Sequence, residues 1–467
     1  MMLFAMPSFA TTYYIDFASG SDTNNGTSKS TPWQRSPGMT GFKGQYTHAQ
    51  GDVFIFKGGV TWTSTALPLT MVNSGGAGNP DKYTVDSSWF TGTSFSAPIF
   101  DGGSIIGNLI FGSAVSNITI NGLKLQNGGQ STAVDSFHAL ECDDCDQLTI
   151  SNNILTPFTW LGIYLPATQT GNTHHGIFIF GNDISNVSMG IVVATAAPNA
   201  IVDTVQIHDN VIHDFASKIG GGVHGDGIHL WGQPSDNSQF LSNVKIYNNL
   251  FYGSFDRTFG TSGGMTAFIF SENATSNILI YNNAGSYTGT PTANLFESMI
   301  SLGGNPGAGG GHQVFNNSFY GTIPGMSAAI LLGKSPNTTI QNNILSGMRF
   351  AYFSGDTLSD PGTVIDYNNV GAQEPAMWNN VDTSWAAWQA QGRDRNGVNL
   401  DPKYVLPPAN LHLQSNSPDV AIGINLSTIF TLDKDGQNRP SLGPWTLGAF
   451  ANVAGPKPPP AVRLTIR

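Results

Sequence analysis

One motif recurs along most of this chain and constrains the fold more than any other feature. A β-branched or aromatic strand is followed by a polar pair, usually Asn-Asn, and then by a second apolar strand. The residue before the second strand recurs with steps of 26 to 39 residues, at Leu123, Asn153, Asp183, Asn210, Asn249, Asn283, Asn317, Asn343 and Asn369. A drifting period of this size is typical of a solenoid with loops of variable length.

Asparagine suits this position for two reasons. It tolerates the left-handed backbone conformation that a sharp bend between strands needs. Asparagine side chains stacked in successive coils can also hydrogen-bond to one another as a ladder.

A third strand completes each coil. Strict alternation along it puts one apolar row in the lumen, formed by Ile163, Ile191, Ile228, Phe268, Ile300 and Ile330. The outward row is then Tyr164, Val192, His229, Ile269, Ser301 and Leu331. The pattern predicts an all-β fold, a single right-handed parallel β-helix with three strands per coil, in which strands dominate and helices are short.

Composition agrees with this fold and excludes several function classes. The charged fraction is 10%, against about 25% in an average domain. The net charge of −11 argues against a nucleic-acid partner, because binding to the phosphate backbone depends on many Lys and Arg side chains. The hydrophobic fraction of 40% is too high for a disordered chain. No stretch approaches the roughly 18 apolar residues that a membrane span needs, so none is predicted.

The two ends of the repeat carry a family resemblance. The opening Tyr13-Tyr-Ile-Asp-Phe-Ala-Ser-Gly and the later Gly51-Asp-Val-Phe-Ile-Phe-Lys-Gly-Gly are similar to the first strands of the pectate-lyase-like right-handed β-helix superfamily. The tail is similar too, with Trp385 and Trp388 on a short helix at about 384–390, followed by Asp401-Pro-Lys-Tyr, Leu411-His-Leu and Leu447-Gly-Ala-Phe. The resemblance implies the fold for nearly the whole chain. It leaves the function open, because this superfamily contains lyases, hydrolases, epimerases and non-catalytic adhesins.

The chain divides into three parts on this reading. Residues 1–10 resemble the end of a signal peptide, with Ser8 and Ala10 at the cleavage positions, although a non-native start is the alternative. Residues 11–454 form the β-helix, with capping strands first and a closing segment from about 370 to 454. Residues 455–467 read as a proline-rich linker or tail. We expect a monomer that is secreted or held at the cell surface.

The chain has two cysteines, Cys142 and Cys145, three residues apart. Zinc would need two further ligands, and no second cysteine pair supplies them. The sequence therefore favours a local disulfide or two free thiols in a turn over a metal or redox site.

Histidines gather between residues 174 and 229, in the region of the longest repeat step. The repeat accounts for two of them. His208 takes the slot of Tyr247 and Tyr281, and His213 takes the slot of Tyr252 and Tyr320, so both favour stacking along the solenoid over catalysis.

The segment from His224 to Trp231, His-Gly-Asp-Gly-Ile-His-Leu-Trp, departs from the repeat. Asp226 falls in a largely lumenal row with Leu161, Met189, Thr266, Ser298 and Ala328. A carboxyl group at the edge of an apolar lumen must be hydrogen-bonded or have a raised pKa, as a general acid requires. We therefore predict a catalytic site of Asp226, His229 and His224. The alternative is a structural aspartate that caps a loop beside an outward histidine.

The residues around this segment suggest a substrate. Trp160, Tyr164 and Trp231 are expected on one outer face, where flat rings can stack on sugars. Lys218 and Arg257 fall side by side in consecutive coils, with Arg349 at a comparable turn. These cations could bind a uronate or sulfate group or merely solubilise a turn.

An acidic group lies two to three coils earlier, formed by Asp135, Glu141, Asp143, Asp144 and Asp146. Hard oxygen ligands of this kind suit calcium, for which Asp143, Asp144 and Glu141 are weak candidates. A solvated turn is the alternative, and no other cofactor is predicted.

The segment at Asp226 also resembles the Asp-Gly-Ile/Phe-Asp motif of family-nine pectate lyases and, in part, a motif of polygalacturonases. The lyase resemblance implies calcium carboxylates at this motif and a lysine base about one coil later. This chain has Gly225 and His229 at two of those positions and no lysine near Met265. The lyase machinery is therefore not expected here.

Three functions follow as hypotheses. We expect a secreted enzyme that cleaves glycosidic bonds in an extracellular polysaccharide, with hydrolysis slightly favoured, although the sequence identifies only one of its two carboxyl groups. The first alternative is a lyase acting on a uronate-containing glycan. The second is a non-catalytic β-helix adhesin or glycan-binding protein.

Overall fold

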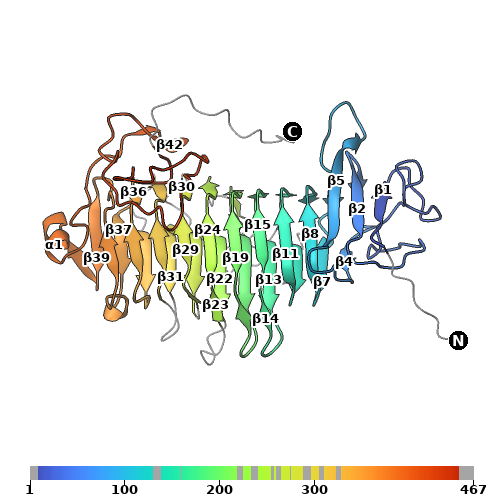
Figure 1. Ribbon diagram of the computed structural model, residues 1–467, viewed down its shortest axis with the longest axis horizontal. Helices are drawn as coiled ribbons and strands as arrows, with labels where there is room; N and C mark the ends of the chain where they lie inside the picture. The colour runs from blue at the N-terminus through green and yellow to red at the C-terminus, as the bar shows by residue number, and fades with distance from the viewer. Residues whose placement is uncertain are drawn as a thin grey trace.

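The computed structural model describes residues 9–129, 138–158, 160–217, 225–232, 240–253, 257–258, 265–273, 275–287, 296–303, 310–321 and 328–451. Its strands stack into an elongated solenoid whose coils follow one another along the long axis (Figure 1). Each complete coil contributes one strand to each of three long sheets, which we call A, B and C. The predicted right-handed parallel β-helix with three strands per coil is confirmed.

Sheet A contains β1 (Thr12–Ile15), β2 (Val53–Gly58), β5 (Asp81–Phe90), β8 (Ser116–Asn121), β11 (Asp146–Ser151), β15 (Ile177–Phe180), β19 (Val205–His208), β24 (Val244–Tyr247), β29 (Leu279–Tyr281), β32 (Gln313–Phe315), β35 (Thr339–Gln341) and β38 (Val364–Asp366). Sheet B contains β4 (Leu69–Met71), β7 (Ile110–Ser113), β10 (His138–Asp143), β13 (Leu161–Ala167), β17 (Met189–Thr195), β22 (Gly225–Gly232), β27 (Met265–Glu272), β31 (Phe296–Gly303), β34 (Ala328–Gly333), β37 (Phe350–Ser354), β39 (Glu374–Trp378) and β40 (Val381–Thr383). Sheet C contains β3 (Thr61–Trp62), β6 (Ile99–Asp101), β9 (Lys124–Gln126), β12 (Ile154–Leu155), β16 (Asp183–Ser185), β20 (Val211–His213), β25 (Leu250–Tyr252), β30 (Ala284–Tyr287), β33 (Ser318–Gly321) and β36 (Ile344–Ser346).

Smaller sheets and short helices lie outside the three long sheets. A four-stranded sheet contains β14 (Thr173–His174), β18 (Ile201–Val202), β23 (Phe240–Ser242) and β28 (Thr275–Ser276), and two short pairs are β21 (Ala216–Ser217) with β26 (Arg257–Thr258) and β41 (Tyr404–Leu406) with β42 (Asn410–Leu413). In the described ranges helical structure is limited to a 3-10 turn, η1 (Thr357–Ser359), and α1 (Trp385–Ala390). The Ser384 hydroxyl caps α1 by accepting from the Ala387 N–H, so the short helix predicted at about 384–390 is confirmed.

The turn between sheets A and C holds the predicted asparagine ladder. The side-chain oxygen of Asn283 accepts from the backbone N–H and the side-chain amide of Asn249, both at 3.0 Å. Asn283 in turn donates from both groups to Asn317, at 2.9 and 3.0 Å. The ladder residues are Asn153, Asn182, Asn210, Asn249, Asn283, Asn317, Asn343 and Asn368.

The ladder corrects the predicted repeat at two places. Asn182 and Asn368, rather than Asp183 and Asn369, occupy the ladder, because the hydrogen-bonding amide sits one residue earlier in those coils. The residue before each ladder position has positive φ, as at Asn248 (57°) and Asn282 (53°). In each Asn-Asn pair, therefore, the first residue adopts the left-handed conformation of the bend and the second residue forms the ladder.

The ladder ends at Asp394, whose Oδ1 accepts from both amide groups of Asn368 and whose Oδ2 accepts from the Trp388 indole. The remaining C-terminal segment then runs back over the turns between sheets A and C, above β30 and β36 (Figure 1). Buried Arg439 donates to Asn282 Oδ1 at 2.9 Å.

The predicted outward aromatic rows are confirmed on sheets A and C. Phe180, His208, Tyr247 and Tyr281 stack at centroid distances of 5.0, 4.6 and 4.8 Å. His213 stacks on Tyr252 at 4.5 Å. Both histidines therefore belong to the solenoid's stacking.

The predicted register of sheet B is correct on β13, β17, β22, β31 and β34, where Ile163, Ile191, Ile228, Ile300 and Ile330 share one row, and it is wrong only on β27. A bulge between Gly225 and Asp226 shifts the pairing, so Ile269, rather than Phe268, lies beside Ile228. Phe270 consequently takes the outward place expected for Ile269, next to His229. Phe268 is buried in the core all the same, stacked on Phe251 at 5.2 Å.

Candidate active site

Three rows of side chains face outward from sheet B, and they hold Asp226, His229, Glu141 and Asp143. The first row runs from His138 through Leu161 and Met189 to Asp226. The second contains Glu141, Tyr164, Val192, His229 and Phe270. The third contains Asp143, Pro166, Ala194, Trp231 and Glu272.

The first row was predicted to be lumenal, and this prediction is wrong. Leu161 and Met189 pack with Val192 in a cluster that is separate from the lumenal core. The reason is a break in alternation, since Gly227 and Ile228 both face inward. A Cβ on Gly227 would lie 2.8 Å from the Phe251 ring of the core.

Asp226 and His229 lie together as predicted, but both are buried. The Asp226 side chain has no exposed surface, and its Oδ1 accepts from the Ala267 N–H at 3.3 Å. His229 Nδ1 lies 3.5 Å from Asp226 Oδ2, and His229 Nε2 lies 3.2 Å from Oε1 of Glu272. His229 and Ser301 are more exposed than the inward isoleucine row, as predicted, but only slightly, since each is 5% exposed against 0% for Ile228 and Ile300.

The other residues predicted for this site divide into two groups. Trp160, Tyr164 and Trp231 are partly exposed and belong to the outer face of sheet B. Lys218, His224 and the side chain of Arg257 lie outside the described residues. Arg349 lies at the start of β37, where its guanidinium is 4.0 Å from the Glu374 carboxylate.

The residues at Asp226 do not fit the calcium centre that the lyase resemblance implies. One position that should hold a carboxylate is His229, whose ring faces Asp226. Asp226 Oδ2 faces this ring, and Asp226 Oδ1 accepts a hydrogen bond from the Ala267 N–H. No lyase step through calcium is therefore derived from this cluster.

A second cluster occupies the same three rows on β10, formed by His138, Glu141 and Asp143. Glu141 accepts from the Asn108 amide, and His138 Nδ1 lies 3.0 Å from its Oε2. Glu141 and Asp143 are two residues apart on β10, so their carboxyl groups lie on the same outer face of sheet B. Glu141 is 14% exposed and Asp143 is partly exposed, so this pair is more accessible than Asp226.

The environment separates the pKa values of these two carboxyl groups. Partial burial, the charge of Glu141 and the hydrogen bond to it raise the pKa of Asp143 to about 7. Burial also acts on Glu141, but the hydrogen bonds and charge from His138, with the Asn108 amide, lower its pKa below the ordinary value of 4.5. Near pH 7 Asp143 is therefore about half protonated while Glu141 is ionised, and between the two pKa values the pair holds one proton, mainly on Asp143.

Aromatic rings surround this pair. The His138 ring lies 4.9 Å from Tyr164, edge to face, and 5.4 Å from Trp160. In the described part of the chain, His138 Nε2 and Asp143 Oδ1 are buried without a hydrogen-bond partner. The cluster thus combines a proton donor, a carboxylate and unused hydrogen-bonding capacity beside flat apolar rings.

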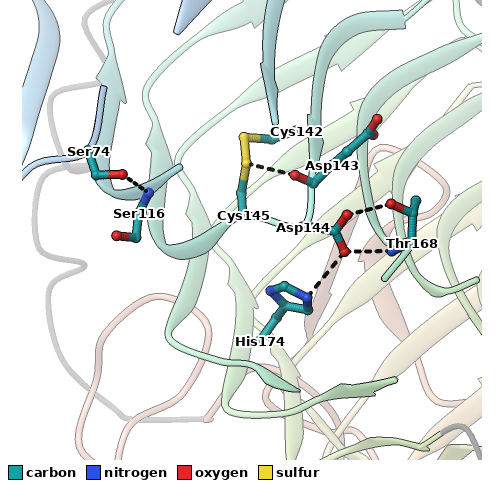
Figure 2. The surroundings of a disulfide bond; sticks show 8 residues. All are labelled: Ser74, Ser116, Cys142, Asp143, Asp144, Cys145, Thr168 and His174. Carbon is teal, nitrogen blue, oxygen red and sulfur yellow. Dashed lines mark hydrogen bonds and ion pairs between the residues drawn. A yellow bond between two sulfur atoms is a disulfide. The ribbon is translucent and has the colours of Figure 1, made fainter. Parts of the chain in front are cut away.

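The turn after β10 is fixed by two anchors, shown in Figure 2. Cys142 and Cys145 form a disulfide with a Cα–Cα distance of 5.6 Å, so the disulfide reading of the sequence is confirmed. Asp144 accepts from the backbone N–H groups of Thr168 and Gln169 at 2.7 and 3.0 Å, and lies 3.3 Å from His174. These anchors hold the backbone on both sides of Asp143.

The acidic group predicted as a calcium site is dispersed by this turn. Glu141 and Asp143 lie on the outer face of sheet B, whereas Asp144 points to the next turn and Asp146 accepts from the His175 N–H. Within the described ranges, no group of three His, Cys, Asp or Glu side chains is placed to hold a metal ion. Calcium binding stays a prediction that the structure leaves untested.

Comparisons with known proteins concern the fold. No protein-family model and no curated protein sequence matches this chain. Among solved structures, it is similar to the pectate lyase Pel9A, with 16% identity over 95% of this chain and 97% of that chain and a TM-score of 0.44. It is also similar to a GH136 lacto-N-biosidase from Eubacterium ramulus (10% identity, 84% of this chain, 67% of that chain, TM-score 0.40) and to an alginate lyase from Paenibacillus sp. (13%, 70%, 91%, 0.39).

The identities are too low to transfer an activity, so the functional assignment rests on the residues of this chain. In the described part of the chain, no helix has the length and apolar character of a membrane span.

Sequence reasoning missed the candidate catalytic role of two residues, Glu141 and Asp143, and missed a third residue, Glu272, altogether. Glu141 and Asp143 were grouped with a solvated turn or calcium site, although their spacing of two within a strand places both on one face. Glu272 was missed because the predicted alignment lacked the bulge at Gly225 and therefore set Ser271, rather than Glu272, beside Trp231.

Proposed function

We propose that this chain is a secreted glycoside hydrolase that cleaves an extracellular polysaccharide over strand β10. The observation that carries the proposal is the Glu141–Asp143 pair on one face of β10, in which the pKa of Asp143 is raised to about 7 and that of Glu141 is lowered below its ordinary value. Hydrolysis of a glycosidic bond needs one carboxylic acid and one carboxylate flanking the scissile bond. The disulfide agrees with export, since disulfides persist in oxidising compartments.

Each residue of the cluster has a role in this proposal. Asp143 donates its proton to the glycosidic oxygen as the bond between that oxygen and the anomeric carbon breaks. Glu141 accepts a proton from the attacking water, whose oxygen bonds to the anomeric carbon. After the product leaves, Glu141 gives up its proton to solvent and Asp143 takes one up, which restores the starting state.

Neighbouring residues keep Glu141 ionised and provide a surface for the sugar. His138 and Asn108 hydrogen-bond to Glu141 and favour its ionised form. Trp160 and Tyr164 supply the ring faces on which a sugar stacks. Tyr164 stays protonated over the working pH range, because burial and the two nearby carboxylates raise its pKa to about 12.

Charge favours hydrolysis of a neutral glycan over elimination from a uronate. Elimination needs a group that neutralises the uronate carboxylate. Strands β10, β13, β17 and β22 contain neither lysine nor arginine. The sugar bound over these strands therefore meets carboxyl groups and aromatic rings, and no lysine or arginine of the four strands themselves.

The pKa values predict the pH dependence of kcat/KM. Asp143 must be protonated, so kcat/KM falls about tenfold per pH unit once the pH rises above about 7. Glu141 must be ionised, so the acid limb lies below pH 4.5. Initial rates across this range check the prediction, and a rate that rises through pH 7 would contradict the assignment of Asp143 as the acid.

The activity itself is tested on a panel of neutral and uronate-containing polysaccharides. Products are read for new reducing ends and for the ultraviolet absorbance of unsaturated uronates. The proposal expects reducing ends without that absorbance. Both signals together would indicate the alternative lyase, and neither signal would favour the alternative adhesin.

A further inference from the structure

The cluster at Asp226 repeats the layout of the cluster on β10. His138, Glu141 and Asp143 occupy the first, second and third outward rows of sheet B. Three coils later the same rows hold Asp226, His229 and Trp231. In each cluster a histidine and a carboxylate pair between the first two rows, at 3.0 Å on β10 and 3.5 Å on β22.

The rows between the two clusters are apolar. They hold Leu161 and Met189 in the first row, Tyr164 and Val192 in the second, and Pro166 and Ala194 in the third. Three strand spacings separate the clusters, which is about 14 Å along the solenoid axis. A polysaccharide chain that lies along this axis over β10 therefore extends toward β22.

The second cluster differs from the first in how its accessible carboxylate is held. Glu272 follows Trp231 in the third row and is 25% exposed. His229 lies between Glu272 and the fully buried Asp226, and its ring packs against Phe270 at 4.8 Å. Asp226 therefore fixes His229, and His229 fixes the orientation of Glu272.

We propose that Trp231 and Glu272 form a second sugar-binding subsite, which binds a ring of the same glycan three coils from the carboxyl pair. A partly exposed indole offers an apolar face to the ring carbons, and the adjacent carboxylate accepts hydrogen bonds from sugar hydroxyls. Asp226 and His229 act as positioning residues in this subsite. As a subsite of the substrate, it rests on the proposed function, but its binding can be measured without cleavage.

The test measures binding of oligosaccharides by calorimetry in an Asp143→Asn background, which leaves them uncleaved. The probes are hexasaccharides and disaccharides of the cello, manno, xylo and arabino series. The variants Trp231→Ala and Glu272→Gln are added to this background. Glu374→Gln is the control, since Glu374 is an exposed carboxylate on β39 of the same sheet.

The proposal expects that one hexasaccharide series binds the background protein and that Trp231→Ala and Glu272→Gln each weaken this binding about tenfold or more. Disaccharide binding stays unchanged, Trp231→Phe restores most of the hexasaccharide affinity, and Glu374→Gln has no effect. A loss of fold alone would weaken both lengths together.

Two results would overturn the subsite. The first is unchanged hexasaccharide affinity in Trp231→Ala, and the second is the absence of hexasaccharide binding to the background protein. Failure of the proposed function looks different, because it shows as an absence of cleavage by the wild-type protein whatever the binding data give.

Discussion

Replacing Asp143 by asparagine is expected to lower kcat by a factor on the order of 10²–10⁴, which is the typical contribution of a positioned general acid. The amide cannot donate the proton that Asp143 holds at neutral pH through its raised pKa. The fold should survive, since asparagine has the same shape and the disulfide and Asp144 fix the backbone on both sides. Initial rates on the polysaccharide that the wild-type protein cleaves measure the loss.

Asp209→Asn is the matched control for this change. Asp209 has a φ of 55° in the turn between sheets A and C, where most neighbouring coils have asparagine. The substitution should therefore leave both rate and stability nearly unchanged. If Asp143→Asn kept the full rate and Asp226→Asn lost most of it, the catalytic acid would be Asp226 on β22, as predicted from the sequence.

Removing one residue from the middle of the asparagine ladder should produce the largest loss of stability. In Asn283→Ala the backbone N–H of Asn249 loses its acceptor, and the Ile246 carbonyl loses the Asn283 amide. Both groups are buried, and a buried group without its partner typically costs about 1–3 kcal/mol, so we expect a loss of about 2–5 kcal/mol. Urea unfolding followed by circular dichroism measures the change in free energy.

Asn172→Ala serves as the comparison for the ladder variant, because the Asn172 amide makes an exposed hydrogen bond to Gln169. Its effect should stay within about 0.5 kcal/mol. An equally small effect in Asn283→Ala would show that the ladder contributes little to stability.

The fold could be predicted in detail because its signals are local and repeated. The asparagine pair marks the same turn in coil after coil, and the outward aromatic slots of His208 and Tyr247 are set by spacing alone. The register failed only where a bulge at Gly225 adds a residue, which alternation cannot reveal. That single shift misplaced Phe268 and concealed Glu272.

The candidate site was harder to predict because it depends on neighbouring coils. Asp226 stood out in the sequence as a carboxylate that interrupts an apolar pattern, and the structure places it against His229. Glu141 and Asp143 looked like members of an acidic turn, since the sequence does not show that Asn108 and Tyr164 lie beside them. Their opposite pKa shifts arise from those contacts and from burial.

The most direct measurement of the central claim is cleavage in water labelled with heavy oxygen, followed by mass spectrometry of the products. Hydrolysis by Glu141 and Asp143 predicts one labelled oxygen at each new reducing end, in a reaction that Asp143→Asn slows by the factor given above. Unlabelled products that carry an unsaturated uronate, or labelled products formed at the full rate by Asp143→Asn, would contradict it.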